Sequence, residues 1–472
     1  MEICYDDEIV TIFQKREGNK LKAKQQDGQG ELSLFKLTWP IFLEFFLFML
    51  MGLADTFMIS AVSDDAVAGV STANQYIQIA ILILGVVATG ASIVVSQYIG
   101  AKRQVEATKI AALSVTLNVI VGLAISGLFI IFSGKIMELM NLQGDVLGYA
   151  KNYLAIVGGF LFFQAIITSV AALIRVQGWT KQAMYVSLGM NVLHIVLNYF
   201  LIFGHYGFPQ LGVEGAAWSS VISRALASIV FIWLLTKAFD VKVKLKNFVT
   251  WSSEYVGKIL RIGIPSAFEQ ILYQTSQIVL LYYVTYLGAE SLSARSYAYN
   301  ISMFIYLFAL AVGTGTAIMI GRYVGAGEKD RAYKQVWASV KIGLIVSLTM
   351  IVFTTTFREP LMGLFTDNEE IIRIGASVLL FSILLETGRT INITVINSLR
   401  ASGDARYPVR IGFISMICIG LSAGYLFVFV LDLGLVGVWL AISLDEWIRA
   451  VLVLFRWKSR KWERFAIVSK EG

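Results

Sequence analysis

The stretches "ATGASIVVSQYIGA" (residues 88–101) and "GTGTAIMIGRYVGA" (residues 313–326) decide the fold, because the second repeats the first. Thr, Gly, Ile, Tyr, Gly and Ala stand at the same places in both stretches, which lie 225 residues apart. The same shift, without a gap, aligns three further pairs: Pro40 with Pro265, Glu44 with Glu269, and Arg175 with Arg400. Two homologous halves therefore follow one another in this chain.

The composition is that of a polytopic membrane protein. Hydrophobic residues make up 57% of the chain and charged residues 15%, and the mean hydropathy is +0.70. Soluble domains carry about 25% charged residues. The apolar residues form runs near the length of about 20 residues that crosses the hydrocarbon core as a helix. An all-α membrane fold is expected.

The apolar runs predict twelve transmembrane helices, at 33–59, 73–97, 107–132, 150–174, 183–204, 214–237, 258–286, 297–321, 333–356, 371–398, 409–431 and 434–455. Because six is even, both halves enter the membrane from the same side and form parallel repeats. We expect the following parts: a tail at 1–32, a first lobe at 33–237, a linker at 238–257, a second lobe at 258–456 and a basic tail at 457–472. Two facing lobes would leave a central cavity between them.

Lysine and arginine predict the orientation. Placing the N-terminal tail in the cytoplasm puts thirty of the 39 basic residues on the cytoplasmic side, with five in outer loops and four inside helices. This is the positive-inside pattern, and it places both termini in the cytoplasm. The net charge of +7 is therefore a topology signal, not a sign of nucleic-acid binding, and anionic membrane lipids are a further partner.

Catalytic motifs are missing from the sequence. With two His and two Cys, it offers little for a metal cluster, and it has no phosphate-binding loop and no Ser/His/Asp set. We therefore expect no enzyme and no cofactor. Transport would have to draw on an ion gradient, and carboxylates inside the membrane are the groups that could bind Na⁺ or H⁺.

Glu44 and Asp55 are two such carboxylates in the first helix. Eleven residues apart, they share one helix face. A carboxylate facing lipid costs several kcal/mol, so both should face the protein interior or a water-filled cavity. Each could bind a cation, or each could be a structural group hydrogen-bonded to a neighbouring helix.

Further charges are predicted at similar depth. Glu269 is the repeat partner of Glu44, and the pair should line a space shared by the two lobes unless each hydrogen-bonds within its own lobe. The spacings of Glu386 with Arg389 and of Asp445 with Arg449 allow pairing along a helix face. A three-residue slip late in the repeat aligns Arg224 with Glu446.

Four stretches give the chain a family resemblance: "LADTFMIS" in the first helix, "GASIVVSQYIGA" after the second, "LNYFLIFGHYGFPQLGVEGAAWSSVISR" over the fifth and sixth, and "NSLRASGDARYP" after the tenth. From residue 33 to about 456 the sequence resembles the multidrug and toxic compound extrusion (MATE) family, NorM-like branch. The resemblance implies two six-helix lobes in a V around a central cavity. It also implies export of amphipathic, often cationic drugs in exchange for Na⁺ or H⁺.

The resemblance also implies site residues. The family's first-lobe cation site corresponds to Asp55, His194, Asn198 and Ser220. His194 replaces the usual Asn, which puts Na⁺ in doubt and makes H⁺ plausible, because histidine titrates near neutral pH.

The acidic positions of the second lobe depart further from the family. Tyr273 stands for a Glu and Arg389 for an Asp, with Glu269 and Glu386 one turn earlier, so no second cation site is carried over. The residues expected around the substrate are Glu44, Glu269, Tyr273, Glu386 and Arg389.

Together these features predict a monomeric, cation-coupled exporter of amphipathic small molecules in the plasma membrane. The main alternative is a flippase for lipid-linked oligosaccharides, which would need a strongly cationic cavity; the acidic residues argue against it, whereas Arg224 and Arg389 keep it open. A channel or a receptor would not need two parallel six-helix copies.

Overall fold

The computed structural model describes residues 32–239, 241 and 244–468, and all but the last residue of the predicted tail 1–32 lies outside them. Six helical spans form the first lobe: α2 (Leu34–Ser60), α3 (Asp64–Gly100), α4 (Gln104–Glu138), a bent span of α5 (Gly144–Tyr153), η1 (Leu154–Gly158) and α6 (Leu161–Val176), α7 (Thr180–Phe203) and α8 (Val213–Ala238). Six more form the second lobe: α10 (Ser253–Thr285), α11 (Ala289–Gly325), α12 (Lys329–Thr356), α14 (Glu369–Ala401), a composite span of α15 (Arg406–Ser415), η3 (Met416–Leu421), α16 (Ser422–Tyr425) and η4 (Leu426–Val430), and α17 (Gly434–Lys458).

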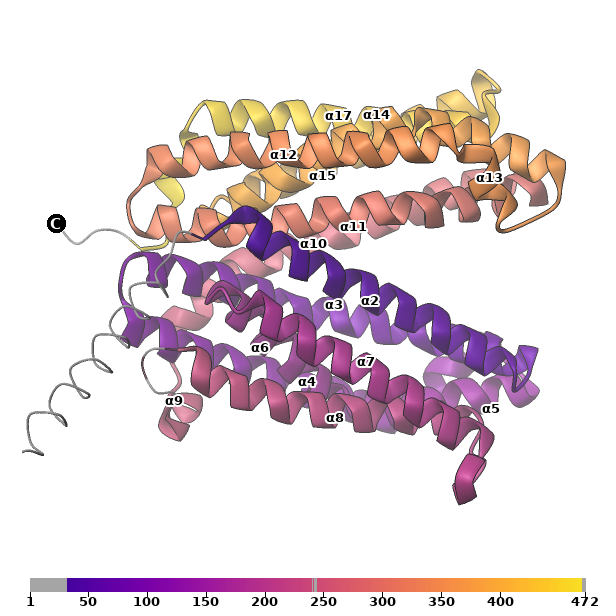
Figure 1. Ribbon diagram of the computed structural model, residues 1–472, viewed down its shortest axis with the longest axis horizontal. Coiled ribbons are helices and arrows are strands. Elements are labelled where there is room, and N and C mark those ends of the chain that lie inside the picture. The colour runs from indigo at the N-terminus through magenta and orange to yellow at the C-terminus, as the bar shows by residue number, and fades with distance from the viewer. Residues whose placement is uncertain (1–31, 240, 242–243, 469–472) are drawn as a thin grey trace, which may run out of the picture.

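The all-α, twelve-span, two-lobe fold is thus confirmed, and each predicted span coincides with one observed span. The first lobe lies below the second in Figure 1, and the short linker helix α9 (Leu245–Val249) lies at the edge of the first. Side-chain caps begin several helices: Ser63 accepts a hydrogen bond from the Ala66 amide, and Asn368 accepts from Glu370 and Ile371.

Nine helices in the described part of the chain are long and apolar enough to span a membrane on their own, and the bent pair around α6 makes a tenth. The remaining two spans, α10 and α17, fall short because they carry polar residues inside the bundle. In α10 the buried one is Glu269, beside three glutamines of which Gln274 is exposed, and in α17 they are Asp445, Glu446 and Arg449. The lower hydropathy of α10 and α17 therefore reflects the polar side chains that these two helices contribute to the second lobe.

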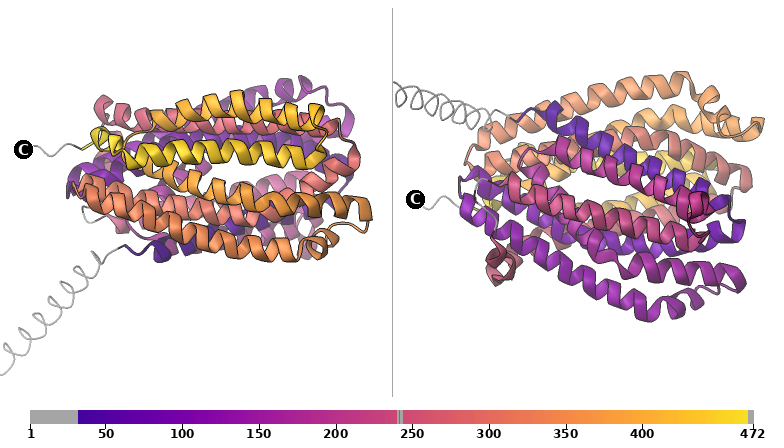
Figure 2. Two further views of the ribbon diagram at one scale, coloured as in Figure 1. Left: turned by 90° about the horizontal axis from the view of Figure 1, so that it is seen from above. Right: turned by 60° about the horizontal axis from the view of Figure 1, so that its bottom comes forward.

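The lobes meet in a seam at one end of the bundle, the end at which the C-terminus lies; we call it the terminal end. A methyl group on Gly100 would clash with the carbonyl of Arg322, and one on Gly325 would clash with the carbonyl of Gln97. These two contacts are related by the 225-residue repeat, so the seam is pseudo-symmetric. From it, α2 and α11 diverge toward the other end (Figure 1); Figure 2 looks onto the second lobe on the left and brings the first lobe forward on the right.

Residues 459–468, which we call the C-terminal strap, connect the lobes across this seam. The strap leaves α17 beside the stacked rings of Trp457 and Trp462, whose centroids lie 4.2 Å apart. Its Ile467 amide donates to Gln97 Oε1 at 2.8 Å, and Val468 is buried in a hydrophobic cluster that is made mostly of first-lobe residues and includes Ile318 and Met319 of the second. The segment expected to be a basic tail is therefore packed against both lobes as far as it is described.

Candidate functional site

A carboxylate cluster lies inside the first lobe, between α2 and α7. His194 Nε2 lies 2.6 Å from Asp55 Oδ1, and Asn198 Nδ2 donates to the same oxygen at 2.7 Å. His194 and Asn198 are buried, whereas 21% of the Asp55 side chain is exposed. The four-residue spacing of His194 and Asn198 puts both on one face of α7, where they can share a single carboxylate oxygen.

Ser220, the fourth predicted member, is one shell further from Asp55. It is buried on α8 and lies near Tyr153 on α5, as does Asn74. Ser223 Oγ, one turn along α8, lies 3.5 Å from His194 Nδ1. The structure thus brings three of the four predicted residues into direct contact.

Tyr153 and Arg224 complete the surroundings of this cluster. Arg224 interacts electrostatically with both Asp55 and Tyr153. In the sequence, Arg224 stood out as the repeat partner of Glu446 and as a cation that keeps the flippase alternative open, whereas Tyr153 was not identified. An arginine within a transmembrane helix was itself the signal, since buried charges are rarely retained without a partner.

Glu44 lies elsewhere in the first lobe and has three hydrogen bonds. Arg175 donates from Nε and Nη2, at 3.1 and 2.7 Å, and Ser187 donates at 2.9 Å. The carboxylate is 1% exposed. The geometry is a bidentate guanidinium–carboxylate pair, the strongest form of this interaction.

The repeat partner Glu269 is held by Arg400 in the second lobe, but through a single hydrogen bond from Nη2, since Arg400 Nε has no partner. Both pairs span 131 residues of sequence, and the 225-residue shift converts one into the other. We expected Glu44 and Glu269 to line a space shared by the lobes unless each bonded within its own lobe. The second arrangement is the one observed, because each carboxylate is bound to an arginine of its own lobe. In the sequence, the alignment of Arg175 with Arg400, beside that of Glu44 with Glu269, was the feature that could have predicted these two ion pairs.

A polar pocket of about 550 Å³, counting the solvent space at its mouth, lies inside the second lobe. Four helices contribute its lining: α10, α11, α14 and α17. Of the residues expected around the substrate, Glu269, Tyr273 and Arg389 line it, whereas Glu44 does not; Asn392, Arg400, Glu446 and Arg449 also line it. The pocket lies within one lobe, whereas the sequence placed the substrate cavity between the two.

Glu386, the remaining predicted residue, does not line this pocket but binds Arg389, which does. Arg389 Nη1 donates to Glu386 Oε1 at 2.7 Å, and Glu386 is completely buried. Arg389 also lies over the Tyr306 ring, 5.6 Å from its centroid.

Each pocket guanidinium has a carboxylate partner. Arg449 donates to Asp445 at 2.7 Å and lies 3.1 Å from Glu446, which accepts from Asn392 at 2.7 Å. With Arg389 on Glu386 and Arg400 on Glu269, the pocket combines both signs of charge with tyrosine rings. Such a wall can orient a polar group while the rings contact apolar parts of a ligand.

Comparisons with known proteins show which family this chain belongs to. A family model described as MatE matches residues 40–200 and 265–426, two stretches that begin 225 residues apart and so confirm the internal repeat. The chain is 40% identical over 443 residues to a protein described as an uncharacterized transporter, YisQ, of Bacillus subtilis, covering 94% of this chain and 97% of that one. It is 29% identical to a probable multidrug resistance protein NorM of Thermotoga maritima, covering 95% and 96% of the two chains.

Solved structures show the same fold. One, described as the outward-facing conformation of a multidrug resistance MATE family transporter of the MOP superfamily, matches with a TM-score of 0.84 at 20% identity. The match covers 90% of this chain and 95% of that chain. A MOP superfamily transporter from Pyrococcus furiosus matches with a TM-score of 0.83, 21% identity and the same coverage. The chain is therefore a multi-pass membrane transporter, not an enzyme, and it belongs to the MatE family.

Proposed function

We propose that this transporter is a cation-coupled antiporter that exports amphipathic small molecules, often cationic ones, across the bacterial plasma membrane. The observation that carries the proposal is the Asp55 cluster: a partly exposed carboxylate inside a transmembrane lobe, held by His194 and Asn198. A carboxylate inside a transmembrane segment is costly, and such residues mark ion or substrate pathways in membrane proteins. The relatives described as multidrug resistance proteins support the class of substrate.

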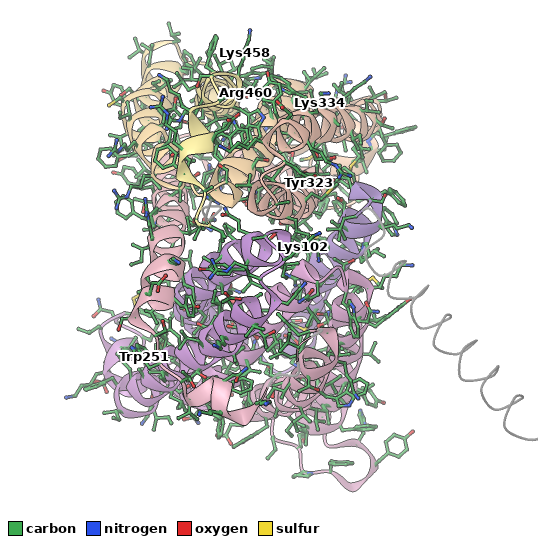
Figure 3. All side chains as sticks on the ribbon, turned by 90° about the vertical axis from the view of Figure 1, so that its left-hand side faces the viewer. Lys102, Trp251, Tyr323, Lys334, Lys458 and Arg460 are labelled. Carbon is green, nitrogen blue, oxygen red and sulfur yellow. The ribbon has the colours of Figure 1, made fainter. Side chains whose placement is uncertain are left out.

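Basic residues support the orientation in which both termini lie in the cytoplasm. Figure 3 looks onto the terminal end, where Lys102, Lys334, Lys458 and Arg460 gather. Cytoplasmic loops are enriched in such residues. In this orientation the seam between the lobes closes the cytoplasmic side, and Asp55 is reached from the outside.

The pocket of the second lobe supports a role as the substrate site. Its tyrosines suit aromatic drugs, and Glu269 and Glu446, each paired with an arginine, are the acidic groups that a cationic amine would contact. A flippase for lipid-linked oligosaccharides would need a cationic cavity for pyrophosphate. Here the guanidiniums of Arg389, Arg400 and Arg449 are each bound to a carboxylate, which does not favour that alternative.

The test is Asp55→Asn in a bacterial host that lacks its own drug pumps. The change keeps the shape of the side chain and removes the charge that the ion cycle requires. Drug resistance should fall to the level of the empty vector while the amount of protein in the membrane stays near wild type. Asp65→Asn, an exposed carboxylate at the start of α3, is the matched control and should keep full resistance. Full resistance in a well-expressed Asp55→Asn variant would refute the ion-site assignment.

A further inference from the structure

Six aromatic rings line one flank of the seam, where α2 of the first lobe lies beside α11 of the second; we call them the ring ladder. Its members are Phe35, Trp39, Phe42 and Phe46 on α2, and Phe304 and Phe308 on α11. Two ring contacts cross between the lobes: the centroids of Phe42 and Phe308 lie 5.7 Å apart, and those of Phe46 and Phe304 lie 5.6 Å apart. The ladder thus joins the lobes along the line from which α2 and α11 diverge (Figure 1).

The rings on α2 lie on the side of the helix that faces away from the first-lobe core. Leu37 and Ile41 occupy the buried side, and the ring positions follow them at about half a turn around the helix. Phe35 is 72% exposed, Trp39 45% and Phe304 38%. A molecule at this flank can therefore reach the faces of these rings without disturbing the core.

The internal repeat shows that closing the lobes does not require rings at these positions. The 225-residue shift aligns the six rings, in the order given, with Leu260, Ile264, Ala267, Ile271, Ile79 and Ile83 on α10 and α3. On that second flank the helices meet through their backbones, because a methyl group on Gly90 would clash with the carbonyl of Ile259, and one on Gly263 with the carbonyl of Val86. The two flanks are equivalent in the repeat, yet one is aliphatic and the other aromatic. Packing alone therefore does not account for the rings.

Aromatic rings recognise a particular class of molecule. Their faces are electronegative and attract cations, and the rings of a ligand stack on them. Aliphatic side chains offer neither contact. A planar aromatic cation can use both, since its ring system can lie against one ring of the ladder while its positive charge lies over the next.

The ladder reaches the depth of the second-lobe pocket but is separate from it. The eleven residues from Phe35 to Phe46 rise about 16 Å along α2, which is about half of the hydrocarbon core. Phe304 precedes Tyr306, a pocket residue, by two positions, or about 3 Å along α11. Two positions turn the helix by about 200°, so the two side chains lie on different faces of α11.

We propose that the ring ladder is a binding site for planar aromatic cations, at the flank between α2 and α11 and separate from the pocket of the second lobe. Trp39 and Phe304, accessible rings on the two helices, determine its specificity. The inference rests on the proposed export of amphipathic cations and names the place where aromatic ones are recognised. Aliphatic cations gain little from the ladder.

The first experiment locates the ligand in the wild-type protein. Full-length protein in lipid nanodiscs is irradiated with an azide derivative of a phenanthridinium dye, which is a planar aromatic cation, and the adducts are mapped by mass spectrometry. Adducts should form within residues 35–46 of α2, a segment that does not line the pocket, and an excess of the parent dye should prevent them. Adducts that the parent dye prevents only at pocket residues such as Tyr273 would overturn the inference.

The second experiment takes its substitutions from the repeat. Trp39→Ile together with Phe304→Ile introduces the side chains found at the aligned positions of the other flank, Ile264 and Ile79. Equilibrium affinity for the phenanthridinium dye should fall at least about fivefold, whereas that for tetrabutylammonium, an aliphatic cation, should stay within about twofold. Trp233→Ile removes a ring on α8 that is 58% exposed and lies outside the ladder, and it should change neither affinity. Equal losses for both cations, or no loss for the dye, would overturn the inference.

Transport separates this inference from the proposed function. In proteoliposomes with a pH or Na⁺ gradient, the double variant should raise KM for the dye at least about fivefold with kcat little changed, because the rings contribute binding and not ion coupling. If wild type moves neither cation with either gradient, the proposed antiport is wrong, while labelling and binding still decide the role of the ladder. If the double variant fails to fold, labelling of the wild-type protein decides it alone.

Discussion

At the residue scale, the second lobe depends on ion pairs that are removed from water. Glu386 and Arg389 are fully buried or nearly so, and their contact is 2.7 Å. Removing one partner leaves the other charged group unpaired at depth, which costs about 3–5 kcal/mol in known buried pairs. Removing one partner should therefore destabilise the protein more than replacing both partners together.

A double-mutant cycle in detergent tests this pair. Glu386→Gln and Arg389→Gln should each lower the melting temperature strongly, and the double variant should lose less than the sum of the two. The same helix offers a matched control in Glu370 and Arg373, which have the same three-residue spacing and a 2.7 Å contact but are exposed to solvent. Their cycle should show little coupling, because exposed pairs contribute little. Additive losses at Glu386 and Arg389 would show that they do not act as a pair.

The two repeat-related glutamates should differ in what they do. Glu269 lines the pocket of the second lobe, whereas Glu44 is enclosed by Arg175 and Ser187. Glu269→Gln should weaken binding of an organic cation by about tenfold, because it removes one negative charge from the pocket wall. Glu44→Gln should leave that affinity within about twofold while lowering the melting temperature more, since Glu44 accepts three hydrogen bonds.

Equilibrium binding to both purified variants, measured beside their melting curves, checks this difference. Equal loss of affinity in the two variants would place Glu44 at the substrate site after all, as the sequence first indicated. Unchanged affinity in both would move the substrate site away from Glu269.

At the element scale, the seam between the lobes depends on helices that approach without side chains between them. Gly325 on α11 meets the backbone of Gln97 on α3, and Gly100 on α3 meets the backbone of Arg322 on α11. No side chain fits at either glycine unless the helices separate. The seam therefore requires glycine at both positions.

Gly325→Ala should hold the lobes apart at the terminal end and reduce efflux at least about tenfold, because the added methyl group meets backbone, which cannot move aside as a side chain can. Gly85→Ala on α3 is the control: nothing lies within 4 Å of its added methyl group, and alanine favours a helix. Drug efflux from cells with equal amounts of each variant is the measurement. Normal efflux by Gly325→Ala would mean that the seam does not close during transport.

The helices themselves were predictable, and their polar contacts were only partly so. Apolar length located every span, including α10, where glutamines dilute the hydrophobic signal. The spacing of Glu386 and Arg389 predicted their pairing, because both lie on one helix. The bond between Glu44 and Arg175 joins two helices, and its pattern in the repeat was visible but was not interpreted as contact. Tyr153 gave no local signal, since one tyrosine in an apolar helix resembles any core aromatic.

At the scale of the whole molecule, the two lobes are linked at one end by more than the seam. Arg322 of the second lobe donates to the carbonyl of Val176 in the first at 2.6 Å. Gln97 of the first lobe donates to the carbonyl of Ala401 in the second at 2.7 Å and accepts from the Ile467 amide of the strap. Alternating access would have to break these bonds together, so the strap contributes to the stability of the closed terminal end.

Val468→Asp should therefore favour separation of the lobes at the terminal end. Val468 is buried in a hydrophobic cluster of mostly first-lobe residues that also reaches the second lobe, and an unpaired carboxylate there would be costly. Ser459→Asp, an exposed position on the same strap, introduces the same charge without that burial and serves as the control. Spin labels at Lys102 and Lys334, one on each lobe (Figure 3), report the separation by distance measurement. A longer distance in Val468→Asp alone is expected, because the strap would release the first lobe while its anchor at Trp457 and Trp462 stayed in place. Identical distance distributions in both variants and wild type would show that the strap covers the seam without stabilising its closure.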